Sequence, residues 1–132
     1  MPLRDEIAGY LNSLEWDAFF TATFARHQKY SHTAMDIVER TLRAPRLRPV
    51  KMFIAAEQHR LGGWHCHGLI QYPDTKWKTS LPSFEQNALS AIGYNRVSVV
   101  HDKAAASMYL SKYLIKDENA GDYRFVGRSK FW

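Results

Sequence analysis

The first quarter of the chain shows a helical and then a strand-like hydrophobic pattern. Apolar residues recur every three or four positions near the N-terminus, which predicts a helix over about 3–14. These residues are Leu3, Ile7, Leu11 and Leu14. Residues 16–24 are rich in aromatic and β-branched side chains and predict a buried strand.

A second amphipathic helix is predicted over about 31–43. Ser31 or Thr33 is expected to cap its first turn, because a hydroxyl oxygen can accept a hydrogen bond from an unpaired backbone N–H group. Its apolar residues share one side and are expected to face the core. They are Met35, Val38 and Leu42.

Two strand-like segments flank a glycine-containing turn in the middle of the chain. Residues 50–58 and 64–72 are largely apolar, and the five residues between them end in Gly62 and Gly63. A double glycine between two such segments is typical of a tight turn. The pattern therefore predicts a β-hairpin.

The second half predicts further helices over about 84–92 and 102–116, both preceded by capping residues. A strand is expected at 96–100, and an edge strand near 123–126. Clustered strands with interspersed helices indicate an α+β fold, in which helices cover one face of an antiparallel sheet. The other face would be free to carry a site.

Length and composition restrict the class of protein. The chain has 132 residues, 45% of them hydrophobic, which predicts one domain over 1–132 with a buried core. No apolar run approaches the ~18 residues of a membrane span, and no signal region is seen, so a cytoplasmic protein without a membrane partner is expected. Cys66 is the only cysteine, which excludes an intrachain disulfide and a multi-cysteine zinc cluster.

Positive charge is modest but clustered. Eighteen Lys and Arg against thirteen Asp and Glu give a net charge of +5. Basic side chains bind phosphates and aromatic ones can stack on bases, so the pattern fits nucleic-acid binding as well as it fits a solvated surface. The candidate nucleic-acid-binding residues are Arg26, Lys29, Arg46, Arg48, Lys76, Lys78, Arg124 and Arg128.

A possible metal site lies on the predicted hairpin. His65 and His67 are two residues apart on a strand, so both imidazoles should project from one face, while Cys66 points into the opposite layer. If Gln58 pairs with Trp64, Glu57 falls opposite His65 on the same face. Two imidazoles and one carboxylate would suit a divalent metal with open positions, whereas a shifted register would separate them.

A stripe of tyrosine and lysine is expected on the helix over about 102–116. Tyr109, Lys112, Tyr113 and Lys116 are related by three and four residues and would share one side, which is equally compatible with an exposed surface. A nearby cation favours the phenolate form of tyrosine, and a metal makes a bound phosphate more electrophilic. With the hairpin site, these parts fit attack by tyrosine on a DNA phosphodiester.

In three motifs the sequence resembles the HUH endonucleases, specifically the replication-initiator (Rep) proteins of rolling-circle plasmids and single-stranded DNA viruses. Residues 19–24 look like their first motif, Glu57 with His65-Cys66-His67 like their metal motif, and residues 109–116 like their Tyr-x-x-Lys motif, here present twice in overlap. The resemblance covers roughly residues 16–120.

The resemblance implies a five-stranded antiparallel sheet, similar to the palm of RNA-recognition domains. It further implies Mn or Mg at the two histidines and the glutamate, and nicking of single-stranded origin DNA, including hairpins. The enzyme would remain joined to the 5′ phosphate and leave a free 3′ hydroxyl, ready for rejoining. The pattern around Tyr113 and Lys116 looks like the single-tyrosine type, which makes Tyr113 the expected nucleophile and Tyr109 a second nucleophile or helper. Lys112 repeats the pattern. Either the chain is a nuclease domain excised from a longer protein, or unwinding would fall to a host helicase.

Three alternatives remain open from the sequence. A transposase or a conjugative relaxase would use the same chemistry in a different biological process. A non-catalytic nucleic-acid-binding domain of the RNA-recognition type would explain the basic and aromatic composition. An iron oxygenase could use two histidines and a carboxylate, but it would leave the tyrosine and lysine stripe unexplained.

Overall fold

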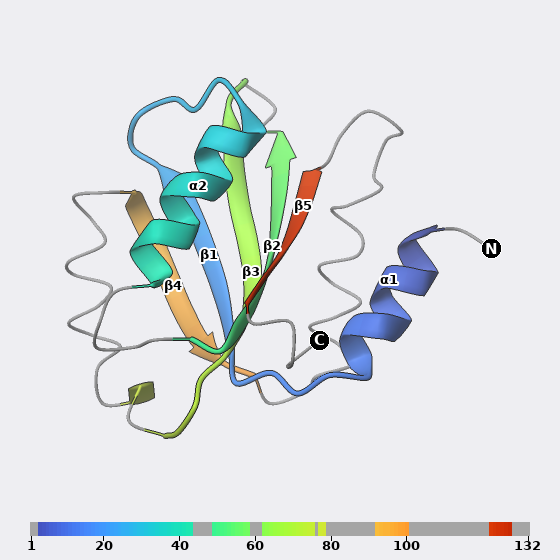
Figure 1. Ribbon diagram of the computed structural model, residues 1–132. Helices are drawn as coiled ribbons and strands as arrows, with labels where there is room; N and C mark the ends of the chain where they lie inside the picture. Colours follow the sequence, from blue (N-terminus) through green and yellow to red (C-terminus); the bar gives the residue numbers. More distant parts are fainter. Residues whose placement is uncertain are drawn as a thin grey trace.

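The computed structural model describes residues 3–43, 49–58, 62–75, 77–78, 92–100 and 122–127 (Figure 1). In chain order the elements are α1 (Leu3–Asn12), β1 (Ala18–Phe24), α2 (Ser31–Leu42), β2 (Lys51–Gln58), β3 (Trp64–Gln71), β4 (Gly93–Val99) and β5 (Asp122–Gly127). The predicted helices over about 84–92 and 102–116 lie outside the described residues.

The strands form one antiparallel five-stranded sheet in the order β4-β1-β3-β2-β5 (Figure 1). The predicted hairpin occupies its centre as β2 and β3, and the predicted edge strand is β5. The α+β class and the five-stranded antiparallel sheet are therefore confirmed.

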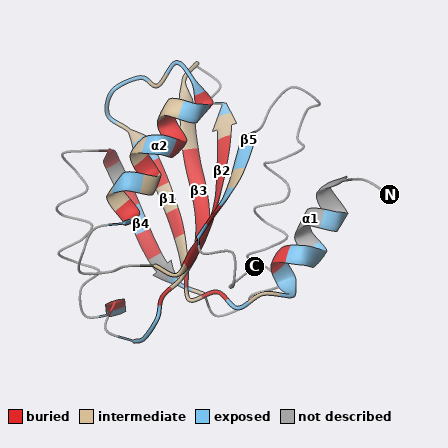
Figure 2. Cartoon of the chain, in the orientation of Figure 1, coloured by how far each residue is buried: buried red, intermediate tan, exposed pale blue. Residues whose placement is uncertain are grey.

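The face of the sheet under α2 is the main core of the protein (Figure 2). Alternate residues of β1, β2 and β3 point into it, because successive side chains of a strand lie on opposite faces. Met35, Val38 and Leu42, the residues of α2 that were predicted to face the core, are all buried. The fully buried strand residues of this layer include Phe20, Ile54, Cys66 and Ile70.

The first helix does not join α2 in covering that face, which corrects the prediction of helices on one face only. Leu11 of α1 packs with Phe53, Leu69 and Trp16 in a smaller cluster on the other side of the sheet. Trp16, predicted as the start of the strand, belongs to the connection because β1 begins at Ala18, and its indole N–H donates a hydrogen bond of 2.8 Å to the carbonyl of Leu11. That bond holds the end of α1 against the face of the sheet opposite α2.

Two predicted boundaries also differ. Neither Ser31 nor Thr33 caps α2: its N-cap is Tyr30, in an extended conformation and without a side-chain cap bond, and Ser31 is buried as the first helical residue. β4 begins at Gly93 and not at residue 96. Gly93 has φ +117°, and a Cβ there would lie 2.5 Å from the backbone nitrogen of Ala25, so glycine allows the strand to start beside the end of β1.

In the described part of the chain, no helix combines the length and apolar character needed to cross a membrane.

Candidate metal centre

The register of β2 and β3 places the three predicted ligands on one face. Glu57 pairs directly with His65, and Ala55 pairs with His67. The pairing of Gln58 with Trp64 is the one on which the prediction depended, and it is confirmed. The two histidines and the glutamate therefore project from the face opposite α2.

The ligand atoms of these residues converge. Nε2 of His65 lies 3.1 Å from Oε2 of Glu57, and Nε2 of His67 lies 3.6 Å from the same oxygen. One ligand atom from each residue lies within 4.8 Å of the other two. His67 is the most enclosed, with 9% of its side chain exposed, against 14% for Glu57 and 20% for His65.

The two separations from the Glu57 oxygen fit a single divalent ion. Two ligand atoms each ~2.1 Å from a metal and about 90–110° apart are separated by roughly 3.0–3.4 Å, close to the two distances from Glu57. Three donors on one side leave further coordination positions open to water or substrate. The cluster of Glu57, His65 and His67 could thus hold a catalytic type of metal.

Burial prepares His67 for this role. Desolvation, with the neighbouring His65 as the next cause, lowers the pKa of His67 to about 4, although Glu57 opposes the shift. The imidazole is therefore neutral at pH 7, the form that binds metals. Cys66 between the histidines faces the core, where burial raises the pKa of its thiol to about 12 and keeps it protonated.

The turn that joins β2 to β3 holds His65 in place. Gly62 and Gly63 have φ values of +92° and +79°, which L side chains rarely adopt. The ring of His27, in the connection between β1 and α2, lies where a Cβ on Gly63 would be, and the N–H of Trp64 donates a hydrogen bond of 3.0 Å to the carbonyl of Gln28. The turn and this connection therefore pack together.

A cavity of about 250 Å³ opens between these two segments and reaches the centre. Thr23, His27, Gly63 and His65 are among its lining residues. Its size leaves room beside His65 for part of a substrate.

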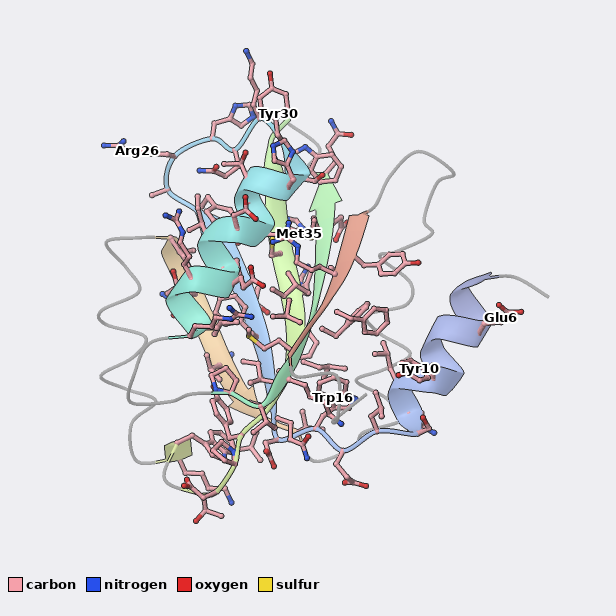
Figure 3. The ribbon with its side chains drawn as sticks, in the orientation of Figure 1. Glu6, Tyr10, Trp16, Arg26, Tyr30 and Met35 are labelled. Atoms are coloured by element: carbon pink, nitrogen blue, oxygen red, sulfur yellow. The ribbon has the colours of Figure 1, made fainter. Side chains whose placement is uncertain are left out.

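Four of the predicted nucleic-acid-binding residues, Arg26, Lys29, Lys78 and Arg124, belong to the described part of the chain, and they lie on three different segments. Arg26 and Lys29 are exposed on the connection before α2 (Arg26 is labelled in Figure 3), and Lys78 lies 5.9 Å from the ring centroid of Trp77. Arg46, Arg48, Lys76 and Arg128 lie outside the described residues.

Arg124 contacts α2 and not the metal face. Its Nη1 donates a hydrogen bond of 2.7 Å to Asp36 and lies 3.4 Å from a carboxylate oxygen of Glu39. The hydrogen bond is the main reason why the pKa of Asp36 is below its usual value. The structure thus separates Arg124 from the centre by the thickness of the sheet.

The predicted catalytic residues Tyr109, Lys112, Tyr113 and Lys116 also lie outside the described residues. Arg96, an exposed residue of β4, was not among the site residues predicted from the sequence, and Tyr123 was predicted only as part of the edge strand near 123–126. Arg96 lies on the metal face because Thr21 pairs with both His67 and Arg96, and the sequence pattern does not give these long-range pairings.

A family model described as Replication-associated protein ORF2/G2P matches residues 17–118 of the chain. The protein belongs to this family, the HUH-type Rep proteins of rolling-circle replication in phages and plasmids. No curated protein and no solved structure matches the chain. The match to the Rep family includes β1 to β4 with the whole metal centre, and membership implies that the protein binds DNA.

Proposed function

We propose that this Rep protein is a metal-dependent endonuclease that nicks and rejoins single-stranded DNA to initiate rolling-circle replication. The supporting observation is the convergence of Glu57, His65 and His67 on the sheet face opposite α2. A non-catalytic binding domain has no need for two imidazoles and a carboxylate so close together. The family match favours a replication initiator over a transposase or relaxase.

We assign Glu57, His65 and His67 as the ligands of a manganese or magnesium ion. When bound, the ion would polarise a phosphate oxygen and stabilise the charge that develops in the transition state. Imidazole is a poor ligand for magnesium, which prefers oxygen, so manganese is the better fit. His67, already neutral, needs to lose no proton at pH 7 to bind it.

We assign Tyr113 as the nucleophile. Its phenolic oxygen forms a bond to phosphorus as the bond from phosphorus to the 3′ oxygen breaks, which leaves a 5′-phosphotyrosine and a free 3′ hydroxyl. The phenolic proton is lost to a base, and the departing 3′ oxygen takes up a proton. Lys116 favours the phenolate, with Lys112 in the same role for Tyr109. The reverse reaction rejoins the strand, and we expect a host helicase to supply unwinding.

The test is the capture of the covalent intermediate. Labelled single-stranded DNA carrying the origin, incubated with protein and Mn, should give an adduct that survives SDS. Tyr113→Phe should abolish it, and His65→Ala with His67→Ala should reduce it strongly.

Three outcomes would contradict parts of the proposal. An undiminished adduct with Tyr113→Phe would transfer the role to Tyr109. An adduct that persists when both tyrosines are phenylalanine would reject a tyrosine nucleophile. A wild-type protein that binds the origin but never forms an adduct would favour the non-catalytic alternative.

A further inference from the structure

The strand register places one row of side chains across the whole sheet through His67. On one side of His67, Ala55 of β2 is its partner, and Tyr123 of β5 is the partner of Ala55. On the other side, Thr21 of β1 pairs with His67, and Arg96 of β4 pairs with Thr21. Directly paired residues share a face of the sheet, so all five lie on the metal face.

The two ends of this row are exposed and chemically different. Tyr123 is 40% exposed at one edge of the sheet, and Arg96 is exposed at the opposite edge. Between these ends, Ala55 is fully buried and Thr21 is half-buried, while the side chains of Glu57 and His65 beside His67 are 14% and 20% exposed. Because neighbouring strands are about 4.8 Å apart, each end lies roughly 10 Å from the metal ligand.

Tyr123 is also part of an exposed aromatic cluster. Its ring centroid lies 5.9 Å from that of Phe125 and 6.0 Å from that of Phe53, which is buried beneath them. Tyr10 of α1, labelled in Figure 3, extends the cluster at 5.8 Å from Phe125. Exposed aromatic side chains that gather next to a reactive centre mark a binding surface.

We propose that single-stranded DNA passes over the metal face and contacts both ends of this row. One base stacks on Tyr123, and a backbone phosphate on the other side of the metal is held by Arg96. This inference rests on the proposed action on single-stranded DNA. An aromatic ring accepts any base face, and a guanidinium matches a phosphate, so the row binds the strand on both sides of the reacting phosphate without reading its sequence.

The test measures binding without cleavage, in EDTA, by fluorescence anisotropy. The probes are oligothymidine of about 12 nucleotides and an abasic strand of the same length and charge. Tyr123→Leu should weaken oligothymidine binding by at least about fivefold and leave the abasic strand unaffected, because only the former offers a base to stack. Arg96→Gln should weaken both and reduce the slope of log K against log salt by about 0.7.

Matched substitutions outside the row control for general effects. Tyr30 is 59% exposed just before α2, where it stacks on His32, and Arg43 has 57% of its side chain exposed at the other end of α2. Tyr30→Leu and Arg43→Gln should bind both probes as the wild type does.

Each outcome bears on the inference. Wild-type affinity in both Tyr123→Leu and Arg96→Gln would overturn it, as would a wild type that fails to bind oligothymidine. A change from dimer to monomer in Tyr123→Leu at unchanged affinity, measured by light scattering, would overturn it by assigning this edge to a second copy of the chain. Loss of affinity in both variants supports it, even if Mn yields no covalent adduct and the nuclease proposal fails.

Discussion

The two faces of one sheet differ in what covers them, and β3 contributes to both. Cys66 lies under α2 in a closed apolar layer, whereas His65 and His67 on either side of it point to the metal face, where α1 packs. The closed face buries the larger apolar cluster. The metal face has a smaller apolar cluster and the partly exposed side chains of Glu57 and His65.

The closed face also fixes the geometry of the metal face. Ala56 pairs with Cys66 in the core, between the pair of Glu57 with His65 and the pair of Ala55 with His67. A slip of one residue would move every side chain to the opposite face, so the packing of Ala56 and Cys66 holds the ligands in register. The metal centre therefore depends on residues that never contact the metal.

The largest effect should come from the closed face. Phe20 is fully buried under α2, and Phe20→Ala should reduce the free energy of unfolding by about 3–5 kcal/mol, because it leaves a cavity in a packed layer. Urea unfolding followed by circular dichroism measures it. Thr21→Ala, at the next residue but on the metal face, is the control and should cost less than about 1 kcal/mol. Equal losses in the two variants would contradict the distinction between the faces.

A smaller free-energy change should follow from altering the metal centre. Glu57→Gln keeps the shape of the side chain and removes its charge, so we expect Mn affinity to fall at least about 100-fold, since even residues that merely orient a ligand contribute about 10–100-fold. Isothermal titration calorimetry measures it. Glu39→Gln on α2 should bind Mn like the wild type. Unchanged affinity in Glu57→Gln would remove the carboxylate from the proposed ligand set.

A substitution in the turn between β2 and β3 should have an intermediate effect on stability and should also weaken metal binding. Gly63→Ala forces a side chain into a φ of +79° and against the ring of His27, which should cost about 1–2 kcal/mol and weaken Mn binding by displacing His65. Thermal unfolding with and without Mn measures both. Gly9→Ala is the matched control: a Cβ there meets nothing within 4 Å, and alanine favours the helix. A Gly63→Ala protein as stable as the wild type would show that the turn adapts.

Much of the fold and of the metal centre could be predicted from the sequence. The parts that could not be predicted depend on contacts between distant segments of the chain. Alternation along 64–72 and the length of the turn were enough to place Glu57 opposite His65, because pairing within a hairpin is local. The prediction that α1 packs on the same face as α2 was wrong. The pattern of an amphipathic helix shows which of its own sides is buried, but it does not show which face of a sheet that side packs against. Arg96 was missed because its relation to His67 passes through Thr21, which joins β3 and β4 across a long sequence separation.

The smallest effect is expected at Arg124, which the charge pattern groups with the DNA-binding residues. It is next to Tyr123 on β5 but faces α2, where it donates a hydrogen bond to Asp36 and forms an ion pair with Glu39. Arg124→Gln should therefore leave the salt slope of oligothymidine binding unchanged, whereas Arg96→Gln removes the same charge and reduces it by about 0.7. An equal reduction in the two variants would mean that DNA also contacts the α2 layer, and the functional difference between the faces would disappear.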